Sequence, residues 1–167
     1  MKYRIFKENK LVIASHNQGK IKEIRELLHP LNIEILSAYD LKIEEPEENG
    51  CTFEENALIK SSFVSKATSL PCLSDDSGIC FSDLNNEPGI HSARWAGKNK
   101  DFNLAMFKIN KEIKKINNPN YNVISFVLCL YAGLIIMMLL FQVVLMVNFH
   151  GHLKAKKDLD MIQYLDL

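Results

Sequence analysis

Neither sign of charge is in excess in this sequence, because 20 Lys and Arg residues balance 20 Asp and Glu residues. Binding to a nucleic-acid backbone depends on surplus basic residues, so we expect no nucleic-acid partner. A small phosphorylated ligand remains possible, because it needs only a local site. The first ten residues contain no apolar run long enough for a signal peptide, so we expect a cytoplasmic protein. The cysteines lack metal-ligand spacing, which predicts free thiols for Cys51, Cys72, Cys80 and Cys129.

The first elements alternate between strand and helix. Leu11–Ala14 is a short β-branched apolar run that predicts a buried strand, and the polar residues 15–19 predict a sharp turn. An apolar stripe then predicts a helix that ends before Pro30, and residues 31–38 predict a second strand. A strand, a polar turn and a helix N-terminus together can bind an anion through unpaired backbone N–H groups. The alternative is that Asn17 and Gly19 only cap the helix and Lys20 is solvated.

An acidic connection follows at residues 39–50. It leads to Thr52, which is placed as the N-cap of a helix running to about Ser69, with Glu55 completing a capping box. Asn56 and Lys60 lie one turn apart on that helix. They could face bound phosphates, although surface or capping roles fit the sequence equally well.

Two adjacent carboxylates, Asp75 and Asp76, come after the apolar run 70–73 and before a Ser-Gly pair that predicts a turn. We expect at least one carboxylate at a strand end in a cleft, where hard cations are held. The alternative is a polar turn in which Asp75 caps the next segment. Further on, the pattern predicts a strand continuing at residues 79–81, an amphipathic helix at 101–115 and a buried strand at 123–132.

Three separate motifs resemble the inosine triphosphate pyrophosphatase family. They are Ser-His-Asn-Gln-Gly-Lys at 15–20, Thr-Phe-Glu-Glu-Asn-Ala at 52–57 and the run from Leu73 to Gly97, and the resemblance covers about Lys10 to Ala132. It implies an α/β fold with a central mixed sheet and flanking helices, and a homodimer. It also implies Mg²⁺-dependent hydrolysis of ITP, dITP or XTP to the monophosphate and pyrophosphate, which cleanses the nucleotide pool.

The resemblance also implies residue roles. We expect Asp76 to bind metal and to act as the general base, Glu48 to be the second metal ligand, with Glu45 and Glu55 as weaker candidates, and Ser77 to contact the substrate. The family commonly has Thr-Gly where this chain has Ser15-His16, so the His16 side chain either crowds the phosphate or donates to it. The expected phosphate cradle consists of Ser15, His16, Asn17, Gln18, Gly19 and Lys20.

The resemblance stops after about Ala132, where an uncharged run continues from Val123 to Val147. That run is long enough for a membrane-spanning helix. However, the codons for Lys157 to Leu165, read one base upstream, permit Gly-Phe-Gly-Tyr-Asp-Pro, the family's base-recognition motif. We therefore predict a frameshift near residues 131–134, so that residues 1–132 are the N-terminal part of the enzyme domain and 133–167 an out-of-frame tail with no membrane role.

This break would remove the C-terminal part of the family fold, including the purine pocket. Two alternatives to an active pyrophosphatase therefore stay open. One is a catalytically inactive truncated remnant of the family, and the other is a single-span membrane protein with a cytosolic domain.

Overall fold

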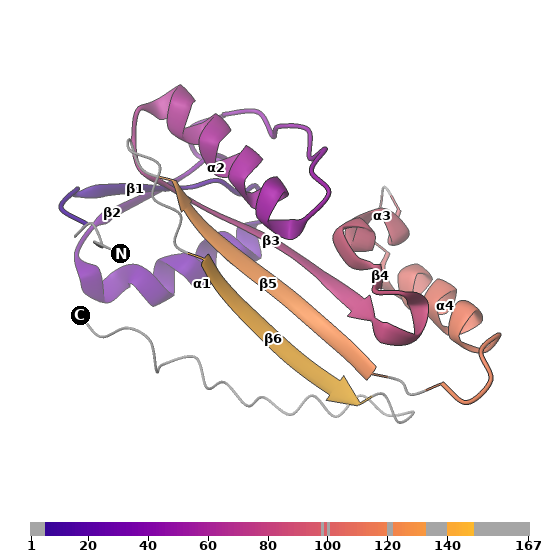
Figure 1. Ribbon diagram of the computed structural model, residues 1–167. Coiled ribbons are helices and arrows are strands. Elements are labelled where there is room, and N and C mark those ends of the chain that lie inside the picture. The colour runs from indigo at the N-terminus through magenta and orange to yellow at the C-terminus, as the bar shows by residue number, and fades with distance from the viewer. Residues whose placement is uncertain (1–5, 98, 100, 120–121, 133–139, 149–167) are drawn as a thin grey trace. The chain divides into compact units, whose positions relative to one another are not determined.

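The computed structural model describes residues 6–97, 99, 101–119, 122–132 and 140–148, the last two segments by their backbone only. Strands occur in the sheet order β2-β1-β3-β5-β6, with β4 pairing to β3 (Figure 1). The chain divides into two compact units, of which the first holds residues up to Asp76 with 128–141 and the second holds 77–127 with 142–167. The strands are β1 (Lys10–Ile13), β2 (Glu34–Ser37), β3 (Cys72–Phe81), β4 (Glu87–Pro88), β5 (Asn122–Ala132) and β6 (Leu140–Asn148). The helices are α1 (Gln18–Leu28), α2 (Phe53–Thr68), α3 (Ser92–Trp95) and α4 (Phe102–Ile113).

The first unit is built on parallel strands with a helix on each face. β1 pairs in parallel with β2 and with the start of β3, where Val12 lies opposite Cys72. Figure 1 shows α1 and α2 on opposite sides of these strands. Strands covered on both faces are apolar throughout, which is why the run from Leu11 to Ala14 is buried. The predicted α/β class, with a mixed sheet and flanking helices, is confirmed.

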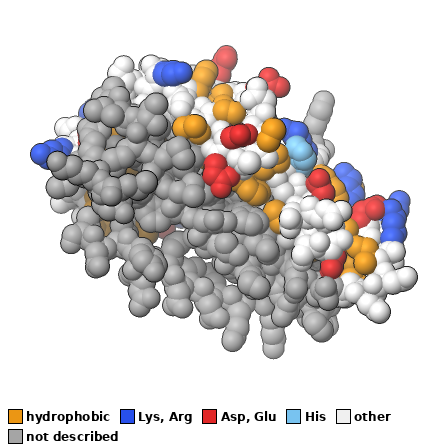
Figure 2. Space-filling model, viewed as in Figure 1, with side chains coloured by type: hydrophobic (Ala, Val, Ile, Leu, Met, Phe, Trp, Pro, Cys, Tyr) orange, Lys and Arg blue, Asp and Glu red, His pale blue; other side chains and the backbone are white. Residues whose placement is uncertain are grey.

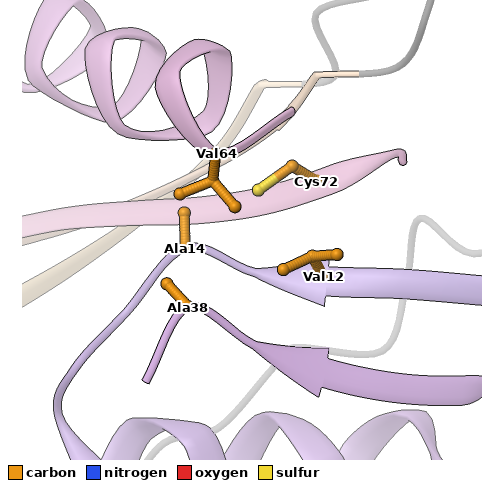
Figure 3. Packing of buried hydrophobic residues seen from close by; sticks show 5 residues of the cluster. All are labelled: Val12, Ala14, Ala38, Val64 and Cys72. Atoms are coloured by element: carbon orange, nitrogen blue, oxygen red, sulfur yellow. The ribbon is translucent and has the colours of Figure 1, made fainter. Parts of the chain in front are cut away.

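The core of this unit joins α2 to the sheet. Figure 3 shows Val64 of α2 above β1 and β3, close to Ala14 and Cys72. Val12 and Ala38 complete the cluster, and all five side chains are at most 5% exposed. The side chains are small, so α2 can pack close to the strands.

The two helix starts follow the predicted signals. Asn17 caps α1, which ends at Leu28 before Pro30. Thr52 caps α2, because its hydroxyl accepts the N–H of Glu55 at 3.1 Å. The helix ends at Thr68 and is followed by the C-cap Ser69, whose φ of 56° is left-handed. The Glu55 carboxylate accepts the N–H of Cys51 at 2.6 Å, one residue before the N–H of a standard capping box.

Two predicted boundaries are wrong. The strand expected over residues 31–38 is only Glu34–Ser37, because a 3₁₀ turn at His29–Leu31 and a left-handed Asn32 precede it. More important for the site, β3 runs without a break through Ser77 and Gly78, so neither the predicted strand end nor a turn with Asp75 as its cap exists there. The local sequence favours a turn here. The backbone stays extended because β3 pairs with β1 at one end and with β4 at the other.

The second unit has its own small core. Phe81 at the end of β3 packs with Ile109 and Ile113 of α4, and Trp95 of α3 lies against them. Asp101 caps α4, which confirms the amphipathic helix predicted here. Where the structure describes the uncharged run, it forms β5 and β6, which confirms the strand at 123–132. The predicted out-of-frame tail lies mostly outside the described residues. None of the helices in the described part of the chain combines the length and apolar character that crossing a bilayer requires.

Candidate active site

The segment after β1 forms the helix N-terminus that the sequence predicted. Ser15 is buried, and its hydroxyl accepts the N–H of Asn17 at 3.2 Å. Asn17 Oδ1 accepts the N–H groups of Gly19 and Lys20 at 3.0 and 3.3 Å. A Cβ at position 19 would lie only 3.2 Å from that oxygen, so glycine suits the place. Two amides of the expected phosphate cradle are therefore already capped, and an anion must share them or displace Asn17.

His16 ties this loop to the segment after β2. Its Nε2–H donates to the carbonyl of Ile43 at 2.8 Å. The sequence left open whether this ring crowds a phosphate or donates to it, and here it donates to backbone. Gln18 is exposed in the first turn of α1. The histidine ring also lines an open hollow of about 500 Å³ together with Tyr39, Asp40, Lys42, Ile43 and Glu44.

Asp75 and Asp76 point to opposite faces of the sheet, as successive residues of a strand do. The hydroxyl of Ser74 donates to the carbonyl of Ala57 in α2 at 2.6 Å, so the even-numbered positions here face α2. Asp76 follows that register and Asp75 faces α1. Both carboxylates are buried, with 5% and 8% exposure for Asp75 and Asp76.

Each helix supplies a lysine to one of these carboxylates. Lys20 of α1 donates to Asp75 Oδ2. Lys60 of α2 lies 3.5 Å from Asp76 Oδ1 and 2.9 Å from Glu48 Oε1. Burial lowers the pKa of Lys60, but the charge of Asp76 and the hydrogen bond and charge of Glu48 raise it more, so the pKa ends above its ordinary value. Lys60 is thus a buried cation.

Glu48 and Asp76, the two predicted metal ligands, meet at the same ammonium. A shared cation shows that their oxygens converge, and carboxylate oxygens are the donors that Mg²⁺ prefers. Within the described residues, no group of three or more His, Cys, Asp or Glu side chains has the arrangement of a metal site. Magnesium is commonly bound by one or two carboxylates plus water and substrate phosphates, so the donor pair fits this ion.

The structure places the other predicted site residues in different surroundings. Glu45 is exposed in the acidic connection. The Glu55 carboxylate accepts a hydrogen bond from the N–H of Cys51. Ser77 follows Asp76 in β3 and is half-buried at the start of the second unit.

Asn56 and Lys60, for which surface and site roles fit the sequence equally well, are both buried. Their spacing along α2 was the sequence signal for this burial. Asn56, Ala57, Lys60, Ser61 and Val64 form one buried helical stripe in which polar residues stand where apolar ones are expected. Polar residues in a buried stripe need partners, and Lys60 has carboxylates there.

These features define a class of protein: an α/β fold with helices on both faces of its first parallel strands, and a buried lysine–carboxylate centre beside the end of β1. The chain belongs to the Ham1 family, whose family model matches residues 11–142.

Comparison with individual proteins agrees. The chain is 50% identical over 112 residues to the dITP/XTP pyrophosphatase of Zymomonas mobilis, covering 67% of this chain and 54% of the relative. It is 50% identical over 107 residues to the enzyme of the same name from Rhizobium meliloti, covering 62% and 50%. A Ham1 protein structure from Coxiella burnetii superposes with a TM-score of 0.77 at 29% identity, over 84% of this chain and 73% of that one. The chain spans about half the length of the curated relatives it matches.

Proposed function

We propose that the protein hydrolyses the purine nucleoside triphosphates ITP, dITP and XTP to the monophosphate and pyrophosphate. Relatives named dITP/XTP pyrophosphatase support this activity. The observation that carries it is the meeting of Glu48 and Asp76 at Lys60, with Lys20 and Asp75 on the other face of the strand. Cations and carboxylates in one buried centre are what phosphoryl chemistry with a divalent ion requires.

The phosphate side of the proposed site is the cradle from Ser15 to Lys20. The helix N-terminus offers N–H groups and a favourable dipole, and Lys20 adds a full positive charge. Asp75 holds Lys20 at the end of β1, so this ammonium is positioned before a triphosphate arrives. Ser77, as the residue after Asp76, is proposed to contact the substrate.

The chemical step rests on Asp76. We assign it as the general base that takes a proton from the water attacking the α-phosphorus. Lys60 fixes the orientation of this carboxylate by lying 3.5 Å from Oδ1. Mg²⁺, held by Asp76 and Glu48, would neutralise the charge that builds on the phosphate oxygens.

The test is pyrophosphate release in the presence of Mg²⁺ from dITP, XTP and dATP. Three proteins are compared. They are the 167-residue chain, its Asp76→Asn variant, and a frame-restored protein in which a one-base change near codons 131–134 returns the later codons to the predicted original frame. We expect the frame-restored protein to prefer dITP and XTP. The 167-residue chain should release pyrophosphate at nearly the rate of its Asp76→Asn variant, because base binding helps to hold the reacting phosphate.

Two results would change the proposal. Turnover by the 167-residue chain equal to that of the frame-restored protein would show that residues 133–167 are functional. No release from dITP or XTP by either protein would overturn the activity and leave the inactive remnant.

We further propose a cytoplasmic homodimer that binds neither nucleic acid nor membrane. Figure 2 shows acidic and basic side chains interspersed over the described part of one face, which gives no extended basic surface there. Cys51, Cys72 and Cys80 are free thiols, as predicted, and free thiols persist in a reducing compartment. Sedimentation of the purified protein measures the oligomeric state, and a monomer at micromolar concentration would contradict the homodimer.

A further inference from the structure

The acidic connection before α2 has no regular structure of its own. Residues 43–50 form neither helix nor strand, so the position of Glu48 depends on how the segment is attached to its surroundings. One attachment is the Glu48 carboxylate itself, which contacts Lys60 at 2.9 Å. A flexible side chain meeting a charge cannot by itself fix the backbone that carries it.

The backbone is attached two residues later, at Gly50. Its N–H donates to Oδ1 of Asn56 at 2.8 Å. Asn56 is only 2% exposed, so this amide is a buried polar group with a backbone partner. Loss of the amide would leave the N–H of Gly50 without this acceptor.

The contact is so close that position 50 has room only for glycine. A Cβ there would lie 2.7 Å from Asn56 Oδ1 and 2.7 Å from the Cβ of Glu55. The requirement is for space, because the backbone of Gly50 is not in the left-handed region. Gly50 and Asn56 are therefore complementary in shape as well as in hydrogen bonding.

Asn56 and Lys60 stand one helical turn apart on the same buried stripe of α2. That stripe thus holds the acidic connection at two points, the backbone through Asn56 and the carboxylate of Glu48 through Lys60. Lys60 also contacts Asp76, so the stripe sets where Glu48 lies relative to Asp76.

We propose that Asn56 is a positioning residue for Glu48: by fixing the backbone at Gly50, it holds the Glu48 carboxylate where it can bind a divalent cation together with Asp76. The cation is the part that rests on the proposed function. The anchoring of Glu48 by Asn56 is a property of the chain itself and is tested separately.

The experiment measures Mn²⁺ binding to the full chain, as a probe for the Mg²⁺ site, together with hydrogen exchange at the Gly50 amide. The variants are Asn56→Ala, Gly50→Ala, the double variant, Glu48→Gln and Ser61→Ala. Ser61 is the matched control, because it is a buried polar residue of α2 whose hydroxyl donates within the helix, to the carbonyls of Ala57 and Leu58.

We expect Asn56→Ala to raise the Mn²⁺ dissociation constant about tenfold, the scale seen when a residue that orients a metal ligand is lost. It should also speed exchange of the Gly50 amide, while Ser61→Ala changes neither. Gly50→Ala alone should weaken Mn²⁺ binding. Its effect should shrink but not vanish in the Asn56→Ala background, because the contact with Asn56 Oδ1 is gone while the close contact with the Cβ of Glu55 remains.

The possible outcomes test the metal site and the anchoring role of Asn56 separately. Absence of Mn²⁺ binding by the unaltered chain would overturn the proposed metal site, while exchange at Gly50 would still decide whether Asn56 is the anchor. If Glu48→Gln weakens Mn²⁺ binding but Asn56→Ala does not, the positioning role is wrong. Equal effects of Asn56→Ala and Ser61→Ala would also overturn it, because they would reflect general destabilisation of α2.

Discussion

Two loop-and-helix regions deliver a lysine to β3 from opposite faces of the sheet. In the first, the loop after β1 leads into α1, and Lys20 pairs with Asp75. In the second, the acidic connection leads into α2, and Lys60 pairs with Asp76 and Glu48. The two lysines differ in burial, because the Lys20 side chain is 35% exposed and that of Lys60 is 11% exposed.

This difference separates two roles for the same residue type. A half-exposed ammonium with one carboxylate partner can turn to a ligand phosphate at little cost. A buried ammonium between two carboxylates is held by them, and removing it would take away the cation that both carboxylates share. We therefore propose ligand contact for Lys20 and the organisation of Glu48 and Asp76 for Lys60.

The largest expected effect comes from removing the buried cation. Lys60→Met keeps an unbranched side chain, one heavy atom shorter, but removes the cation that Asp76 and Glu48 share, so it should lower the free energy of unfolding by about 3–5 kcal/mol. Lys20→Met should cost less, because water can reach Asp75 through the half-exposed place that Lys20 occupies. Urea denaturation measures both losses, with Lys22→Met on the exposed face of α1 as the control. Equal losses for Lys20→Met and Lys60→Met would remove the distinction between the two regions.

The second prediction separates the two carboxylates of β3. In the frame-restored protein, Asp76→Asn should lower kcat by about 10²-fold or more, the scale of a missing general base. Asp75→Asn should act mainly on KM, since Asp75 contacts Lys20 and its side chain lies on the other face of β3 from the proposed base Asp76. Steady-state kinetics with dITP gives both constants. If Asp75→Asn reduces kcat more than Asp76→Asn does, the two roles are reversed.

The third prediction concerns alkaline pH. The folded-state pKa of Lys60 lies above its ordinary value of 10.5. A raised lysine pKa stabilises the folded state fully below the unfolded pKa, and this contribution is lost as pH rises through the folded pKa. The free energy of unfolding should therefore fall more steeply above pH 10.5 in the unaltered protein than in Lys60→Met. Parallel curves for the two proteins would show that the buried lysine is not stabilised by its carboxylates.

The α1 region was more predictable from the sequence than the α2 region. Asn17, the apolar stripe and Pro30 are local signals, and the helix follows them. The burial of Asn56 and Lys60 depends on partners at Gly50, Glu48 and Asp76, which lie elsewhere in the sequence. Helical periodicity alone assigns such polar residues to the surface.

The run from Leu73 to Gly97 shows the same limit of prediction from local sequence. A Ser-Gly pair after two Asp residues favours a turn, but pairing of β3 with β1 and β4 keeps it extended. The strand geometry matters for function, because it sends Asp75 and Asp76 to different helices. The family motifs predicted which residues belong to the site, and only the three-dimensional structure showed which lysine each aspartate meets.

The smallest expected effects compare the two helix caps. Asn17→Ala should destabilise the protein by about 1 kcal/mol, because Asn17 Oδ1 accepts both capped amides at the start of α1. Thr52→Ala should cost only about 0.5 kcal/mol, at the low end for a lost cap. The start of α2 keeps two further attachments, from Glu55 to the N–H of Cys51 and from Asn56 to the N–H of Gly50.

Thermal or urea unfolding of the two alanine variants decides this, with Asn17→Asp and Thr52→Ser as controls that retain an acceptor oxygen. Both controls should remain close to the unaltered protein. A larger loss for Thr52→Ala than for Asn17→Ala would mean that Thr52 itself holds the acidic connection. In that case Asn56 would not be its main anchor, and the proposal for Glu48 would need to start from the cap.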